Sequence, residues 1–103
     1  MIARHWRGLV RTDRAAEYEK HLEVDTFPKL AQIRGFLGGS ILKRVTESGV
    51  EFLVISRWRS VDAIAQFAGP DVEVAVVPAN VQEMMINYDL RARHYEFAEF
   101  SGR

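Results

Sequence analysis

The chain contains no cysteine among its 103 residues. Disulfide bonds, thiolate zinc sites, iron–sulfur clusters and a thiol nucleophile are therefore excluded. An excess of charge of either sign is also missing, because 14 Lys and Arg are balanced by 14 Asp and Glu. Sequence-independent binding of nucleic acid needs an excess of cations that replace the counterions on phosphates, so we expect no nucleic-acid partner. A polybasic patch for anionic lipid is absent as well.

No apolar run approaches the roughly 20 residues that a membrane-spanning helix needs. No basic and apolar leader follows the first methionine, so we expect a cytoplasmic protein that does not contact a membrane. With 48% apolar residues and three prolines, residues 1–103 are predicted to form one compact domain. A domain of this length buries only about 60 to 65% of the surface of its unfolded chain. Any apolar face left over will therefore seek a partner.

The first third of the chain predicts a strand followed by helical segments. β-Branched and aromatic residues favour a strand over residues 2–10. Apolar residues at helical spacing predict a helix over residues 13–24. Pro28 is expected to interrupt this helix, and residues 26–33 are compatible with the start of a second short helix.

The middle of the chain predicts a β-hairpin. Two strand-like runs, residues 36–46 and 50–59, are joined by the short polar sequence 47–49, which ends in glycine. The pair Gly38-Gly39 would weaken a regular strand, and we expect a bulge or a close approach of another group there.

The last part of the chain predicts a helix and a final strand. Ser60 is expected to cap a helix that Gly69-Pro70 ends. Residues 71–85 show both strand-like alternation and helical spacing, and we favour a helix in their second half only. Residues 87–98 alternate as a last strand.

The predicted order of elements is β-α-β followed by a second β-α-β unit, with a hairpin between the two halves. This order closes into an α+β, ferredoxin-like fold: a four-stranded antiparallel sheet with the helices on one face. The third strand is apolar on both sides, with Phe52, Val54 and Trp58 pointing one way. Leu53 and Ile55 point the other way. The second apolar face predicts a homodimer that packs through its sheet faces.

Several segments together resemble a known family. They are residues 1–8, the step 35–36 with the glycines 38–39, and residues 50–60, 61–69 and 93–96. In this pattern the sequence resembles the antibiotic biosynthesis monooxygenase (ABM) domains of the dimeric α+β barrel superfamily. The resemblance implies a sheet-to-sheet dimer and a mostly helical stretch over residues 71–85. The family includes cofactor-independent oxygenases, haem-degrading enzymes and many members of unknown activity.

The haem-degrading branch is the less expected of these. Its members have an Asn on the first strand, a Trp in the second main helix and a His shortly after that helix. The nearest positions here hold His5, Phe67 and the pair Val77-Pro78. Because no histidine lies between His21 and His94, the implied iron ligand is missing. We therefore expect no haem, no metal and no other cofactor.

A cofactor-free oxygenase of this type would bind an acidic aromatic or polyketide-like molecule, remove a proton and let the anion react with dioxygen. Such a site needs a base, a group that stabilises the anion and a dry pocket. His94 is the first candidate for the base, because it titrates near neutral pH and continues an apolar row. His5 is the second. Either histidine is also compatible with simple packing in the core or at the dimer interface.

Further side chains are candidates for substrate binding. Arg7 is expected to hold an anion, although a solvated ion pair is the alternative. Trp58 and Trp6 are expected to be pocket walls, or else plain core residues, and Phe67 is expected to line the same cavity. The set Glu17, His21 and Asp25 shares one helix face and resembles a metal site, but a solvated charged face is favoured.

Two other classes of protein share this strand order or this fold. RNA-recognition domains stack bases on middle-strand aromatics, but the third strand lacks their basic-Gly-aromatic signature. A non-catalytic small-molecule-binding or regulatory dimer is the alternative to an oxygenase, because the fold alone does not decide the function.

Overall fold

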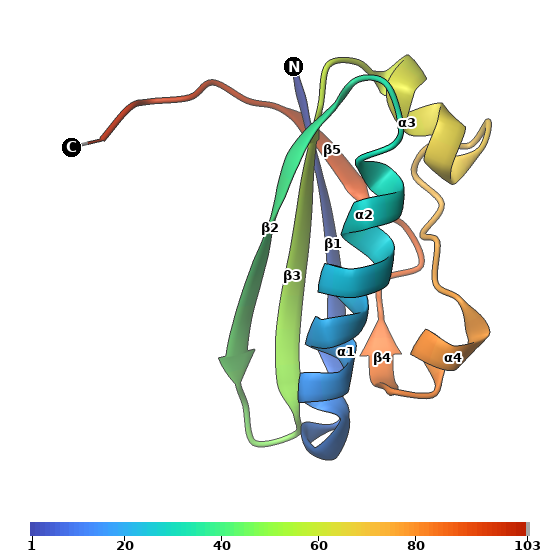
Figure 1. Ribbon diagram of the computed structural model, residues 1–103. Coiled ribbons are helices and arrows are strands. Elements are labelled where there is room, and N and C mark those ends of the chain that lie inside the picture. Colours follow the sequence, from blue (N-terminus) through green and yellow to red (C-terminus); the bar gives the residue numbers. More distant parts are fainter. Residues whose placement is uncertain (103) are drawn as a thin grey trace.

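The computed structural model describes residues 1–102. Five antiparallel strands form one sheet in the order β2-β3-β1-β4, and β5 also pairs with β1. The strands are β1 (Ile2–Val10), β2 (Phe36–Val45), β3 (Val50–Trp58), β4 (Met85–Tyr88) and β5 (Arg93–Glu96). The helices are α1 (Ala15–His21), α2 (Phe27–Leu30), α3 (Val61–Ala68) and α4 (Ala79–Gln82), and Figure 1 shows them gathered on one side of the sheet. The ferredoxin-like α+β fold is thus confirmed.

The predicted last strand is present in two pieces. β4 and β5 pair with different parts of β1, and residues 89–92 bulge out between them. Because Asp89 N donates to Arg7 O at 2.9 Å, the chain stays close to β1 across the break. β4 and β5 thus occupy the place of a single strand beside β1, and the strand order of the predicted four-stranded sheet is unchanged.

The first helix is longer than its sequence pattern indicated. A 3-10 turn (Thr12–Arg14), α1, a π-helical segment (Leu22–Thr26) and α2 follow one another directly. Pro28 was expected to interrupt this run, yet it lies in the first turn of α2, where its missing N–H is tolerated. The wider π turn just before it absorbs the change in hydrogen-bond register.

The β2–β3 hairpin and its bulge agree with the sequence. Thr46 Oγ1 accepts hydrogen bonds from the N–H groups of Ser48 (3.2 Å) and Gly49 (3.1 Å), which fixes the turn. The register shifts between Phe36 and Gly38, and Gly38 has φ of 143°. The bulge expected at this glycine pair is thus confirmed. The group that comes close is a side chain and not backbone or ligand, because the ring of Phe27 lies where a side chain at Gly39 would be.

The segment between α3 and β4 departs from the family pattern. Only the single turn α4 is helical, so the mostly helical stretch implied by the resemblance is wrong, and a helix in the second half is present only as that turn. Residues 69–78, which we call the connecting segment, instead run beside the 89–92 bulge. Ala75 N donates to Leu90 O (3.0 Å), and Ala92 N donates to Glu73 O (2.7 Å). These tertiary hydrogen bonds replace those of a helix.

The two faces of the sheet differ in what covers them. The face toward the helices carries the aligned pairs Arg4–Ser56 and Trp6–Val54, and we call it the covered face. The opposite, open face carries the pairs His5–Ile55 and Arg7–Leu53. Leu42, beside Leu53, is 45% exposed there. The expected apolar residues on both sides of β3 are therefore present, and the homodimer stays a prediction.

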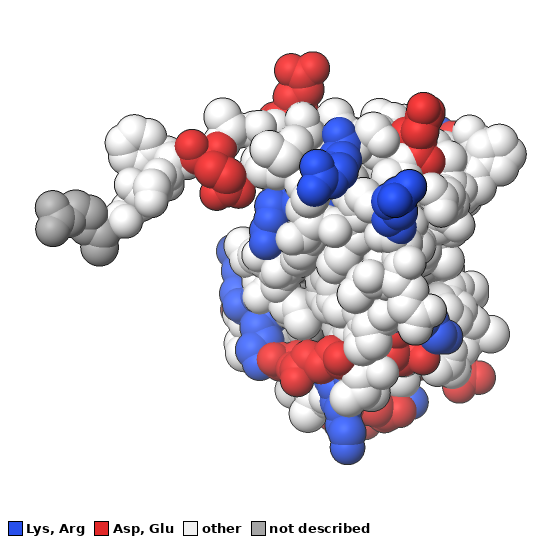
Figure 2. Space-filling model, turned by 45° about the horizontal axis from the view of Figure 1, so that its top comes forward, with Lys and Arg blue, Asp and Glu red and all other residues white. Residues whose placement is uncertain are grey.

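The surface has no concentration of charge of one sign on the face that Figure 2 shows, where acidic and basic side chains are scattered around an uncharged area. None of the described helices is both long and apolar enough to cross a membrane.

Candidate functional site

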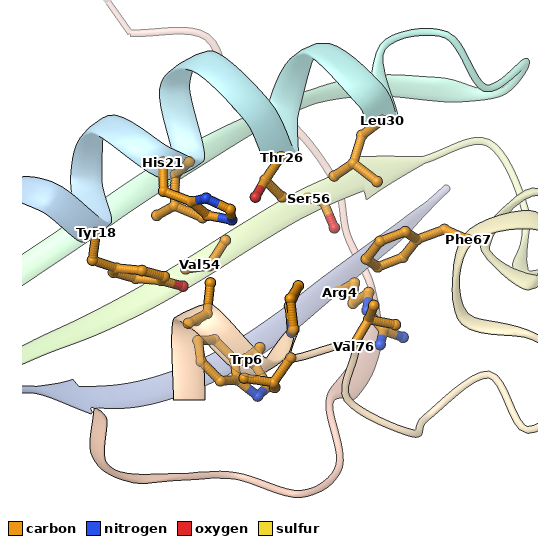
Figure 3. Close-up of a pocket in the computed structure, with 14 residues that line it drawn as sticks. Arg4, Trp6, Tyr18, His21, Thr26, Leu30, Val54, Ser56, Phe67 and Val76 are labelled. Carbon is orange, nitrogen blue, oxygen red and sulfur yellow. The ribbon is translucent and has the colours of Figure 1, made fainter. Parts of the chain in front are cut away.

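A cavity of about 70 Å³ lies between the covered face and the helices. Its walls come from β1, β3, the α1–α2 run, α3 and the connecting segment, and most of them are aliphatic or aromatic (Figure 3). The lining residues with polar atoms are Arg4, Trp6, Tyr18, His21, Thr26 and Ser56. No carboxylate belongs to the lining.

The α1–α2 run contributes an imidazole to this cavity. His21 lies at the junction of α1 and the π-helical segment, and its side chain is only 15% exposed. Its ring stacks on that of Tyr18 with centroids 6.4 Å apart, and its Nε2 lies 3.7 Å from Asp25 Oδ2. Leu22 and Thr26, at the two ends of the π-helical segment, also line the cavity. π-Helical turns are frequent at functional sites.

Arg4 is the charged residue of the covered face. It is 5% exposed and has an aromatic neighbour, since its Cζ lies 5.7 Å from the centroid of the Phe67 ring. Its guanidinium donates to Val74 O (3.0 Å) and to Val72 O, and so anchors the connecting segment to the sheet. Burial lowers the pKa of Arg4 to about 10, and the charge of Glu73 opposes this effect. Arg4 therefore stays cationic at neutral pH.

His94 supports the same guanidinium. Arg4 Nη1 and His94 Nε2 are 2.8 Å apart, and because an arginine only donates, Nε2 is the acceptor and carries no proton. The pKa of His94 is lowered, first by burial and then by the positive charge of Arg4, while Glu73 acts in the opposite direction. A neutral imidazole that accepts from Arg4 is consistent with both effects.

The Tyr18 hydroxyl is a neutral donor in the cavity. Figure 3 shows it pointing from α1 toward the space above Val54. Burial raises the pKa of Tyr18, so its proton stays in place across the physiological range. Trp6 has its own partner, because its Nε1 donates to Asp89 O at 2.8 Å. The Trp6 ring therefore serves as a fixed wall.

Phe67, Trp58 and His94, three of the residues predicted from the sequence, lie on the cavity side of the sheet. Phe67 lines the cavity. Trp58 is fully buried in the core beside α3, and its Nε1 donates to Ser56 Oγ at 2.8 Å, so it supports a lining residue without being one. His94 is one residue removed from the cavity, behind Arg4.

His5 and Arg7, the other two predicted residues, lie on the open face. His5 packs edge-to-face against Tyr95 with ring centroids 5.1 Å apart. Arg7 donates to Glu51 Oε2 (2.7 Å) and to Asn87 Oδ1 (3.2 Å). The sheet separates both side chains from the cavity.

The sequence analysis missed Arg4 and placed His21 on a solvated helix face, whereas Trp6 was expected as core or pocket wall. Alternation along β1 puts Arg4, Trp6 and Val10 on one face. The sequence does not show which face the helices cover, because Leu9 on the opposite face is equally apolar. His21 lies three residues after the buried Tyr18 on α1, and this helical spacing was a signal that could have placed it beside the covered face.

The helix-face set Glu17, His21 and Asp25 does not form a metal site. Glu17 is tied to Arg14 through two hydrogen bonds, of 2.7 and 3.1 Å, and Asp25 pairs with Lys29 at 3.1 Å. Within residues 1–102 no group of three potential metal ligands comes together.

Comparison with known proteins identifies solved structures with the same fold. No protein-family model matches the sequence, and no curated protein matches it either. Among solved structures, a Bacillus cereus protein provisionally assigned as an antibiotic biosynthesis monooxygenase matches with 15% identity and a TM-score of 0.63, over 100% of this chain and 98% of its own. A Deinococcus radiodurans protein with the same provisional assignment matches with 16% identity and a TM-score of 0.65, with the same coverage.

A third solved structure extends the comparison to haem chemistry. The haem degrader MhuD from Mycobacterium tuberculosis, with two haems bound in its active site, matches with 19% identity and a TM-score of 0.67, over 99% of this chain and 100% of its own. The chain has the ABM-type fold. The architecture implied by the sequence resemblance is thereby confirmed, and at these identities the likeness concerns the fold.

The cavity of this ABM-type fold does not fit a porphyrin. A volume of about 70 Å³ is small beside the roughly 300–1,000 Å³ of sites for larger ligands. His21 is the one lining side chain with an imidazole nitrogen, and it lies among Tyr18, Leu22 and Thr26 on the α1–α2 run. The described residues thus offer a compact aromatic pocket with one cation and one imidazole.

Proposed function

We propose that this protein is a monooxygenase that binds a small aromatic substrate in the cavity of the covered face and oxidises it with dioxygen without a cofactor. The observation that supports the proposal is the combination in one cavity of aromatic walls, a buried cation at Arg4 and a sheltered imidazole at His21. Oxygenation through a substrate anion needs these three elements. The solved relatives of this fold include proteins provisionally assigned as monooxygenases.

The proposed reaction uses a phenol-type substrate that supplies all the electrons. A base removes the hydroxyl proton, and the resulting anion gives one electron to dioxygen. The superoxide and the substrate radical then join in a C–O bond at a ring carbon that bears hydrogen. The O–O bond of this peroxide breaks as that C–H proton leaves, which yields a carbonyl and one water. One oxygen atom enters the product, and two electron pairs of the substrate reduce dioxygen.

His21 is our choice for the base. It lines the cavity, and its Nε2 lies 3.7 Å from Asp25 Oδ2. His94, the first candidate from the sequence, accepts a hydrogen bond from Arg4 and so belongs to the site through that residue. His5 lies across the sheet and is not included.

The size of the cavity limits the substrate. Its volume of about 70 Å³ is below the roughly 150 Å³ of a cavity that binds benzene, so we propose a single-ring substrate whose entry displaces the wall slightly. A polyketide-like substrate with several rings would need the connecting segment to move, because Val76, Val77 and Pro78 form the wall on that side.

The test is oxygen uptake with a panel of substrates, from benzenediols to anthrone. His21→Ala is expected to lower turnover by about 10² to 10⁴, the usual contribution of a positioned base. His5→Ala, on the open face, is the matched comparison and is expected to lower turnover less than tenfold. If the His5 variant is the impaired one, the assignment of the base is wrong. Binding of these compounds without any oxygen uptake would leave the alternative, a non-catalytic small-molecule-binding or regulatory dimer.

Haem degradation is not expected. Titration with haemin should give no tight, histidine-type absorption band, because the cavity does not fit a porphyrin. Stoichiometric tight binding followed by ring opening with a reductant would contradict this prediction.

A further inference from the structure

The charge of Arg4 has no acidic partner beside it. Of the five N–H donors of a guanidinium, three are used by Val72 O, Val74 O and His94 Nε2, all of which are neutral acceptors. Within residues 1–102, no carboxylate lies within ion-pair distance of Arg4. The acidic group that most influences its charge, Glu73, is 3.6 Å from the guanidinium of Arg91 and is shared with it.

A buried cation without a counter-ion is unfavourable in a protein interior. The rest of the cavity does not neutralise it, because its lining contains hydroxyls, an indole and an imidazole but no acid. The site therefore carries a net positive charge in a mostly apolar enclosure. Such an enclosure strengthens electrostatic attraction compared with water.

Resting on the proposed function, we propose that the cavity favours its ligand in the anionic form, a single-ring aromatic carboxylate or the phenolate left when a phenol loses its proton, with the charged oxygen bound by Arg4. Two N–H groups of Arg4 remain for this oxygen, one on Nε and one on Nη2. The ring of the ligand then lies among the aromatic walls formed by Trp6, Tyr18 and Phe67.

His94 is assigned as a positioning residue for Arg4. His94 Nε2 and the two carbonyls of the connecting segment accept hydrogen bonds from three N–H groups of the guanidinium. The two remaining N–H groups of Arg4 therefore keep a fixed direction. The face of Phe67, 5.7 Å from Arg4 Cζ, adds a further constraint. A ligand anion thus meets a preorganised cation, which reduces the entropic cost of binding.

The experiment measures binding of benzoate and of its neutral isostere benzamide by tryptophan fluorescence, with calorimetry as a check. The intact protein is expected to bind benzoate about 10- to 100-fold more tightly than benzamide, because hydrogen bonds to a charged group are stronger. Arg4→Met should bring the ratio close to one without weakening benzamide. Arg57→Met, an arginine of β3 on the open face, is the matched control and should keep the ratio. Equal binding of the two probes by the intact protein overturns the proposal, as does an Arg4→Met variant that keeps the preference.

A second arm covers the case in which Arg4→Met does not fold. The intact protein is titrated with 4-nitrophenol, which ionises near neutral pH, and the affinity is expected to rise with the ionised fraction. The titratable groups that face Arg4 or the cavity are His21, His94, Glu73 and Tyr18, and the raised pKa of Tyr18 keeps it neutral over this range. Benzamide titrated over the same pH range reports the effect of the other three. If the affinity for nitrophenol changes with pH in the same way as the affinity for benzamide, the proposal is overturned.

Positioning by His94 has its own readout. His94→Ala should reduce the preference for benzoate, and His94→Gln, whose amide oxygen accepts from Arg4, should restore it. If alanine and glutamine behave alike, His94 does not position Arg4. None of these measurements needs oxygen chemistry. An anion preference without oxygen uptake would therefore contradict only the proposed function, and uptake without an anion preference would contradict only this inference.

Discussion

Two arginines three residues apart on β1 have opposite surroundings. Arg4 points to the covered face, where it is 5% exposed and donates to neutral acceptors only. Arg7 points to the open face, where its side chain is 35% exposed and pairs with the carboxylate of Glu51 at 2.7 Å. The residue type is the same and the strand is the same. The difference comes from what covers each side of the sheet.

The comparison shows where chemistry is available in this fold. On the open face the charge of Arg7 is satisfied by Glu51, which Arg44 also contacts, so it has little left for a ligand. On the covered face the charge of Arg4 is held in place but not neutralised. A sequence motif that contains both arginines therefore says little about function until each is assigned to a face.

The largest effect is expected on the open face, from a change that prevents its burial in a dimer. Leu53→Glu places a carboxylate in the apolar area that Ile55 and Leu42 share. Its cross-strand neighbour Arg7 already pairs with Glu51, so burying a second carboxylate there is strongly unfavourable. The native chain is expected to have twice the 11.8 kDa mass of one subunit in light scattering, and the variant the mass of one subunit. Val24→Glu, on an exposed position of the π-helical segment, is the control and should leave the dimer intact. A native mass near that of one chain at micromolar concentration would contradict the predicted dimer.

The next effect separates the two arginines by stability. Arg4→Ala leaves the carbonyls of Val72 and Val74 without their donor and opens a void, so we expect it to lower the free energy of unfolding by about 2–4 kcal/mol. Arg7→Ala removes a partly exposed ion pair and should cost less than about 1 kcal/mol. Denaturant unfolding of both variants measures the difference. Equal losses would mean that the covered face gives Arg4 no special role.

The smallest effect concerns the protonation of His94. Because its pKa is lowered in the folded protein, the unfolded chain binds a proton more readily over the pH range just below 6.5. The contribution of His94 to stability is therefore present above that pH and is lost as the pH falls. The free energy of unfolding of the native protein should be lower at about pH 5.5 than at about pH 7.5. This decrease should be smaller in His94→Gln, because glutamine cannot take up the proton. A pH dependence that is identical in the two proteins would contradict this prediction.

Much of the fold was predictable because it depends on local patterns. The hairpin turn at 47–49, the bulge at Gly38-Gly39 and the cap at Ser60, which accepts from Ala63 N at 3.2 Å, are each determined by residues close together in the sequence. The connecting segment was less predictable. Its alternating valines favour a strand as much as a helix, and its hydrogen bonds to the 89–92 bulge are formed only in the folded chain.

The sequence by itself determined the order of the elements, the absence of thiol chemistry and the alternation that divides β1 between two faces. Only the tertiary structure decided which histidine and which arginine meet in a cavity. Arg4 and His94 are 90 residues apart in the sequence and are joined by the pairing of β1 with β5. His21 reaches the same cavity because α1 packs its Tyr18 side against Phe52 on the covered face. Both facts depend on long-range packing, which no local pattern of residues encodes.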